Sequence, residues 1–186
     1  MTRETGMTSV TETGGGAAGL VLRPLAAGDE GQFRAGHEAM AAEGFAFGLA
    51  LDPGLGWDAY LRRLDDHRAG RNLPERFVPG TFLVADVAGG IVGRVSVRHR
   101  LNDFLLREGG HIGYAVLPGH RRRGYATEIL RQGLVIARSL GIGRVLVTCD
   151  DGNAGSAAVI EACGGRLENV VATGAGQPPK RRYWIG

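Results

Sequence analysis

The chain has 186 residues, a length typical of one domain that buries a core without disulfides or metals. Apolar residues make up 44% of the chain, which excludes a disordered protein, and a net charge of +3 is too small to indicate nucleic-acid binding by itself. No apolar run approaches the ~18 residues of a membrane span, and Cys149 and Cys163 lack metal-ligand spacing, so we predict neither a membrane span nor a metal site.

The first 19 residues are rich in threonine, glycine and serine and have no apolar periodicity. They predict a disordered tail, or a start that is assigned too early, because Met7 is a second candidate start. No hydrophobic segment of a signal peptide is visible there, so we expect a cytoplasmic protein. The rest of the chain, residues 20–186, is expected to form a single domain.

Hydrophobic periodicity and turn residues predict eleven elements in the order β-α-α-β-β-β-α-β-α-β-β. The expected strands are 20–25, 81–87, 91–98, 112–117, 144–148, 167–173 and 181–185. The expected helices are 29–42, 57–68, a helix from about Ala126 that Gly141 ends, and 154–163. A hairpin turn is expected at Gly89-Gly90.

A basic loop between one of these strands and the helix after it has the clearest chemical meaning. Arg121, Arg122 and Arg123 precede Gly124, and the apolar stripe of the helix begins at Ala126. The first N–H groups of a helix have no intrahelical partners, and the helix dipole adds partial positive charge there. Gly124 removes a side chain where an anion must approach the backbone. The loop therefore predicts a pyrophosphate site, with an ordinary solvated basic turn as the alternative.

The motif Arg121-x-x-Gly124-x-Ala126, after a strand that ends at Pro118, resembles the central signature of the GNAT superfamily of acetyl-CoA-dependent N-acetyltransferases. The order of elements from about Leu20 is also similar to that family's. The resemblance implies an α/β (α+β) fold of GNAT type, with a central mixed, mostly antiparallel sheet of about six or seven strands flanked by helices. It also implies acetyl-CoA as co-substrate. The cofactor-binding residues that it implies are Tyr114, Ala115, Val116, Arg121, Arg122, Arg123, Gly124, Tyr125, Ala126, Thr127, Asn153 and Ser156.

The downstream part of this match contains one departure from the family. Asn153 opens the last predicted helix and Ser156 lies in its first turn, so both fit simple N-capping, and by resemblance both also line the cofactor groove. Many family members place a tyrosine four residues after that serine, where it protonates the leaving thiolate. Here the position is Ile160, so the resemblance transfers no proton donor.

Two residues of the 112–117 region are candidate catalytic groups. Tyr114 lies on the strand face that carries the base in those family members that have one there. His111, on the opposite face, has a side chain that titrates near neutral pH, although a histidine on a strand is more often structural. Glu108 acting through water and His99 are the alternatives.

We therefore predict an enzyme that transfers an acetyl group from acetyl-CoA to a primary amine of a small-molecule or peptide acceptor, by direct attack in a ternary complex. The missing tyrosine keeps a non-catalytic acyl-CoA sensor as the alternative.

The basic runs 121–123 and 180–182 lack interleaved aromatic residues, so no nucleic-acid partner is expected. Family members are often dimers, so the resemblance is compatible with a homodimer. The loops 45–55 and 99–108 carry no dense acidic cluster, which disfavours a polycationic acceptor.

Overall fold

The computed structural model describes Ala17 and residues 19–186, so the predicted tail lies outside the described residues apart from Ala17 and Gly19. The strands are β1 (Leu20–Arg23), β2 (Gly80–Val87), β3 (Gly90–Arg98), β4 (Ile112–Val116), β5 (Val145–Asp150), β6 (Arg166–Val171) and β7 (Lys180–Ile185). The helices are α1 (Glu30–Ala41), α2 (Trp57–Ala69), α3 (Tyr125–Ser139) and α4 (Ala154–Ala162).

All seven strands form one sheet in the order β1-β2-β3-β4-β5-β7-β6. Neighbouring strands are antiparallel except for the parallel pair β4 and β5. The predicted α/β fold with a mostly antiparallel sheet is confirmed, and the order of strands and helices is the predicted one. One turn differs by a residue: the left-handed positions of the β2–β3 hairpin are Ala88 and Gly89, and Gly90 already begins β3.

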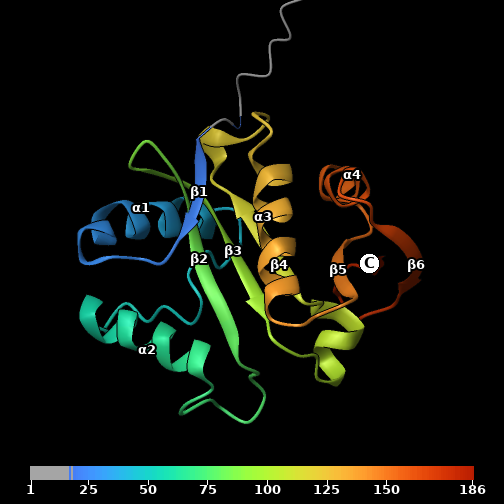
Figure 1. The fold of residues 1–186 in the computed structure, drawn as a ribbon, viewed down its shortest axis with the longest axis horizontal. Helices are drawn as coiled ribbons and strands as arrows, with labels where there is room; N and C mark the ends of the chain where they lie inside the picture. The colour runs from blue at the N-terminus through green and yellow to red at the C-terminus, as the bar shows by residue number, and fades with distance from the viewer. Residues whose placement is uncertain (1–16, 18) are drawn as a thin grey trace, which may run out of the picture.

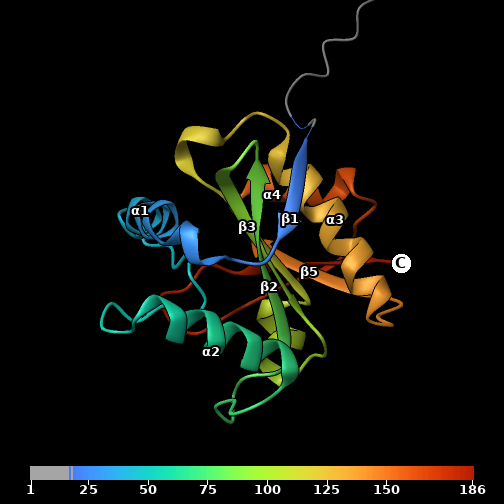
Figure 2. The same ribbon diagram turned by 60° about the vertical axis from the view of Figure 1, so that its left-hand side comes forward.

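Two layers of helices cover the sheet (Figures 1 and 2). Helix α3 packs on β3, β4 and β1, and α4 lies beside α3, while α1 and α2 cover the opposite face over β3 and β2. The predicted stripe of α3 forms the centre of the first layer, since Ile129, Leu130 and Ala137 are fully buried. Within the described part of the chain, every helix is too short or too polar to span a bilayer.

Between β4 and β5 the sheet opens. Ile112 and Val147 pair across the two parallel strands, whereas β4 continues to Val116 in register with β3. Helix α3 starts beyond the open end of β4, and α4 starts just after the end of β5. The parting of β4 from β5 therefore places the N-terminal ends of two helices around one gap in the ladder.

Candidate functional site

The loop before α3 presents backbone N–H groups without intrahelical partners. Gly124, at the N-cap, has a φ of 76°, a left-handed conformation that favours glycine. The first hydrogen bond of the helix runs from Glu128 N to Gly124 O, at 3.3 Å. The N–H groups of Tyr125, Ala126 and Thr127 precede this bond, so the helix offers them no carbonyl. A Cβ added at Gly124 would approach only the Cβ of Ala17, at 3.9 Å, so an anion has room here.

The three arginines of this loop differ in what they contact. Arg121 is held against α1, because its guanidinium donates to both carboxylate oxygens of Glu43, at 3.2 and 2.5 Å, and to Val116 O at 3.3 Å. Arg122 and Arg123 are exposed, and neither forms an ion pair with a described residue. The structure thus leaves two guanidinium groups free for an anion, while Arg121 joins the loop to α1 and β4.

The gap between β4 and β5 exposes backbone groups of β4. Hydrogen-bonding groups alternate between the two edges along an antiparallel strand. Leu117 N, just after β4, donates to Val92 O on the β3 side at 2.9 Å. By alternation, the N–H and C=O groups of Tyr114 and Val116 point toward β5, which has already diverged. An extended ligand can therefore pair with this edge of β4 as an additional strand would.

The side chains of the predicted strand residues lie on different faces. Tyr114 and Val116 pack against the core under α3, and Ala115 is buried in the core under α1 and α2. In the loop, Tyr125 is buried against the α3 core, whereas Ala126 and Thr127 are half-buried. The predicted cofactor residues on β4 and in the first turn of α3 thus offer mainly backbone groups to a ligand, whereas the exposed arginines of the loop offer their side chains.

A cavity of about 290 Å³ lies at the open end of the β4–β5 pair. It brings together three predicted site residues, Tyr114, Asn153 and Ser156, with residues of β3, β5, β7 and the loop after α1. Asn153 caps α4, since its Oδ1 accepts from Ser156 N at 2.9 Å, which confirms the capping interpretation. The Tyr114 hydroxyl lies 2.8 Å from the Ser156 hydroxyl, so a phenol from β4 reaches the start of α4.

The position of this phenol bears on the proton donor that the family match lacks. Ile160 is fully buried in the core and does not line the cavity. Burial raises the pKa of Tyr114 to about 12, although its hydrogen bond with Ser156 acts in the opposite direction. Tyr114 therefore stays protonated at neutral pH and is suited to donate a proton rather than to act as a base.

His111 occupies a different environment. It is buried beside the ring of Trp184, and it is absent from the lining of the cavity. Its backbone N donates to Leu146 O at 2.7 Å, and its Nδ1 accepts from Leu146 N at 2.9 Å. Burial lowers the pKa of His111, and the charge of Arg98 lowers it further. These contacts join β4 to β5 just before the strands part, and the catalytic role of His111 stays a prediction.

We expect His111→Ala to lower stability without changing the pH profile of catalysis. The substitution leaves the buried Leu146 N–H without an acceptor, which costs about 1–3 kcal/mol in the free energy of unfolding. Thermal denaturation measures the first effect, and kcat/KM against pH measures the second. A variant with unchanged melting temperature and a lost ionisation in its pH profile would show that His111 is the base after all.

The residues of β3 in this cavity were not predicted from the sequence. Arg94 and Arg98 line it, as does Phe45 from the loop after α1. Arg94 lies over the Phe45 ring, at 5.1 Å from its centroid. The sequence does show two charged residues spaced four apart in a mostly apolar strand. Their common face follows from the period of two, but the cavity beneath them depends on how β4 and β5 part.

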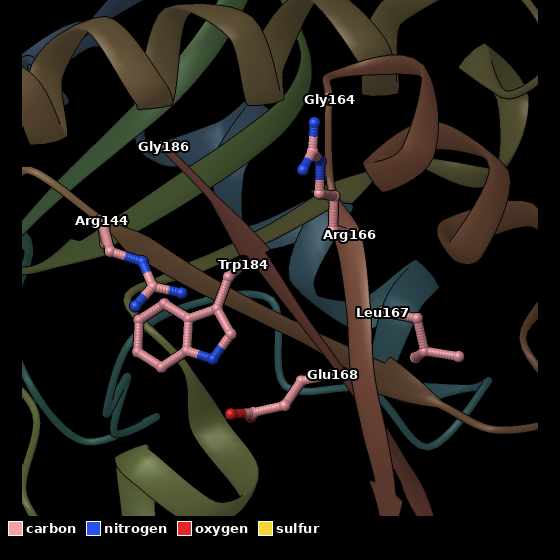
Figure 3. Close-up of a pocket in the computed structure, with 7 residues that line it drawn as sticks. All are labelled: Arg144, Gly164, Arg166, Leu167, Glu168, Trp184 and Gly186. Carbon is pink, nitrogen blue, oxygen red and sulfur yellow. The ribbon is translucent and has the colours of Figure 1, made fainter.

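Three larger cavities in the described part of the chain contain no predicted site residue. One of about 530 Å³ lies over β6 and β7 (Figure 3), where the Arg144 guanidinium stacks on Trp184, 4.9 Å from the ring centroid. Trp184 pairs with Leu146 near the start of β5, whereas the predicted site lies at the other end of that strand. The other two, of about 610 and 380 Å³, lie beside α2.

The fold and the site together define a mixed α/β domain in which a helix N-terminus with free N–H groups lies beside a pair of parallel strands that part. The chain belongs to the acetyltransferase (GNAT) domain family, whose sequence model matches residues 19–166. This confirms the family that the loop motif predicted. The match ends at the start of β6, so β7, which pairs with β5 inside the sheet, comes from outside the matched segment.

Solved structures are similar to this chain in fold. An acetyltransferase from Agrobacterium tumefaciens is 23% identical with a TM-score of 0.61, and the match covers 100% of this chain and 99% of that one. RimJ from Mycobacterium smegmatis, in complex with CoA-disulfide, is 20% identical with a TM-score of 0.64, covering 89% and 81%. The protein yncA from Salmonella typhimurium, with its cofactor acetyl-CoA, is 16% identical with a TM-score of 0.61, covering 90% and 93%. None of the curated proteins matches the chain.

Proposed function

We propose that this protein transfers the acetyl group of acetyl-CoA to a primary amine, by direct attack within a ternary complex. The single observation that carries the proposal is the parting of β4 from β5 beside the N-terminus of α3. This arrangement offers an extended edge for a linear arm and unpaired amides for a phosphate group in one continuous site. Membership of the acetyltransferase family supports the acetyl transfer.

Acetyl-CoA fits the residues that are present. Its pyrophosphate would lie on the N–H groups of Tyr125, Ala126 and Thr127, where the helix dipole also favours negative charge. Arg122 and Arg123 are exposed beside these amides and would neutralise the phosphates with forked donors. The pantetheine arm would follow the open edge of β4. The binding of acetyl-CoA by yncA and of a CoA derivative by RimJ, on the same fold, supports this assignment.

Acetyl-CoA supplies the activated acetyl group, and the residues of the chain orient it and manage one proton. The amine nitrogen forms a bond to the carbonyl carbon, the carbon–sulfur bond breaks, and the nitrogen gives its extra proton to solvent. Unpaired N–H groups on β4 are suited to stabilise the oxygen that becomes negative during the attack. Holding the two reactants side by side supplies most of the rate enhancement.

The leaving thiolate needs a proton, and we propose that Tyr114 supplies it. The phenol lines the cavity, and its hydrogen bond with Ser156 directs it toward the start of α4. In this chain the proposed donor lies on β4. In many family members the donor is a tyrosine on the helix that corresponds to α4, at the position that Ile160 occupies here. The raised pKa keeps the proton on Tyr114 until the thiolate forms. Transfer of that proton leaves a phenolate, which solvent reprotonates, and a positioned general acid of this kind typically contributes ~10²–10⁴-fold.

A screen of primary amines with acetyl-CoA tests the proposed function. Release of coenzyme A thiol is followed with a thiol-reactive chromophore, and acetyl-CoA binding is measured separately by calorimetry. We expect binding in the absence of an amine and thiol release with a subset of the panel. Binding without thiol release from any amine would favour the non-catalytic sensor, and absence of binding would overturn the site itself.

A further inference from the structure

Two arginines of β3 flank the cavity on the side opposite Tyr114. Arg94 and Arg98 stand four residues apart in β3, so both side chains project on the face covered by α1 and α2. Both line the cavity. A Cβ added at Gly113 would lie 3.1 Å from Arg98 Nη1 and 3.7 Å from Arg94 Nη1. The two guanidinium groups therefore meet beside the residue that precedes Tyr114.

These arginines have donors to spare. Arg94 Nη1 donates to Gly113 O at 3.2 Å, and Arg98 Nη1 donates to Gly109 O at 3.1 Å. A guanidinium has five N–H donors, so each group uses a small part of its capacity in these bonds. The Nε of Arg94 is fully buried and has no hydrogen-bond partner among the described residues.

No carboxylate in the described part of the chain compensates the two charges. Among the described residues, neither arginine has a carboxylate oxygen within the 4.0 Å of an ion pair, in contrast to Arg23, which bridges two aspartates. Asp150 is the one acidic residue in the lining of the cavity, and it is already paired with Lys180. The cavity therefore holds two cations beyond those that its own residues balance.

Such an arrangement is costly unless an anion completes it. Burial and, to a lesser extent, the neighbouring charge of Arg98 together lower the pKa of Arg94 to about 10. Arg94 is still protonated at neutral pH, so the protein keeps two like charges together in a half-buried site. Burying unpaired charge is unfavourable, whereas carboxylate and phosphate groups match the forked donors of arginine and form strong bidentate hydrogen bonds.

We propose that Arg94 and Arg98 form an anion subsite for the acceptor, so that the amine acetylated here also carries a carboxylate or a phosphate. The inference rests on the proposed acetyl transfer and specifies its acceptor. The subsite lies next to Gly113, and the open edge of β4 for the thioester begins at Tyr114, so an anchored acceptor brings its nitrogen to the reacting carbonyl. The phosphates of coenzyme A have a separate site at the start of α3.

Matched pairs of amines test the subsite. One arm compares L-amino acids with their carboxamides, and the other compares phosphoethanolamine with ethanolamine, with coenzyme A release as the readout. We expect the anionic member of at least one pair to have the higher kcat/KM, by roughly 10- to 100-fold, as one or two charged hydrogen bonds provide. The arm in which the preference appears identifies the anion. Equal rates within both pairs, or a preference for the neutral members, would overturn the proposal.

Substitution of the arginines separates this subsite from the coenzyme A site. Arg94→Gln and Arg98→Gln are expected to abolish the preference for the anionic member while the KM for acetyl-CoA stays unchanged, and Arg98→Lys is expected to restore part of it. Arg100→Gln is the matched control, because Arg100 is exposed and lies outside the cavity. A rise in the KM for acetyl-CoA with an unchanged acceptor preference would show that the arginines serve the cofactor instead.

Failure of the proposed function would be seen separately. If no amine releases coenzyme A, the same pairs are compared by thermal denaturation in the presence of coenzyme A. The anion subsite then predicts a higher melting temperature with the anionic member in the wild-type protein and no rise in Arg94→Gln or Arg98→Gln. If the protein releases no coenzyme A, equal melting temperatures with the anionic and the neutral member of each pair would overturn the subsite.

Discussion

Gly124→Glu is expected to weaken acetyl-CoA binding by on the order of 100-fold or more, because a carboxylate held against the pyrophosphate costs several kcal/mol. The substitution puts bulk and negative charge at the N-terminus of α3, where the amides of Tyr125 and Ala126 have no intrahelical acceptor. Isothermal titration with acetyl-CoA measures the loss. The same residue change also strains the backbone, because Gly124 has a left-handed φ.

Two controls separate the charge from the strain. Gly141 lies at the other end of α3 with a φ of 81° and open space around its Cβ position, so Gly141→Glu introduces the same strain and charge far from the pyrophosphate. It is expected to bind acetyl-CoA as the wild-type protein does. Gly124→Ala retains the strain without the charge, and we expect an intermediate loss. Undiminished binding by folded Gly124→Glu would refute the phosphate site at this loop.

Tyr114→Phe is expected to lower kcat by on the order of 100-fold while the dissociation constant of acetyl-CoA stays unchanged, because the substitution removes a proton donor and leaves the ring. The ring of Tyr114 packs against the core under α3, so the fold is retained. Pre-steady-state and steady-state rates of coenzyme A release, with a saturating amine, measure the effect. Tyr183→Phe is the matched control: its fully buried phenol donates to Glu161 outside the cavity, so kcat should not change.

The pH profile provides a second test of this role. A general acid loses activity only when it is deprotonated, and burial places the pKa of Tyr114 at about 12. The rate is therefore expected to rise as the acceptor amine loses its proton and then to stay level up to about pH 10, with no descending alkaline limb. A descending limb well below pH 10 that disappears in Tyr114→Phe would mean that the phenol titrates much lower than its environment indicates. An unchanged kcat in Tyr114→Phe would leave the thiolate to be protonated by solvent.

The sequence by itself determined the family, the order of the elements and the free N–H groups of the loop before α3. These are local properties: the strand, the Arg121-to-Ala126 motif and the apolar stripe of α3 follow one another without interruption in the chain. The free N–H groups at the start of α3 depend only on where the helix begins, and a left-handed glycine at Gly124 marks that position. The cap that Asn153 forms on Ser156 is likewise a contact over three residues.

Only the tertiary structure decided what surrounds the reacting centre. Tyr114 meets Ser156 across 42 residues of sequence, and Arg121 is paired with Glu43 in the turn after α1. The Nδ1 of His111 accepts a hydrogen bond from a backbone N–H of β5. In the sequence, Arg94 and Arg98 are only two charges on a strand. Their proposed role depends on the tertiary structure, in which no carboxylate of the described residues forms an ion pair with either of them. Periodicity specifies which face a side chain takes, but its partners depend on which strands pair and where two of them part.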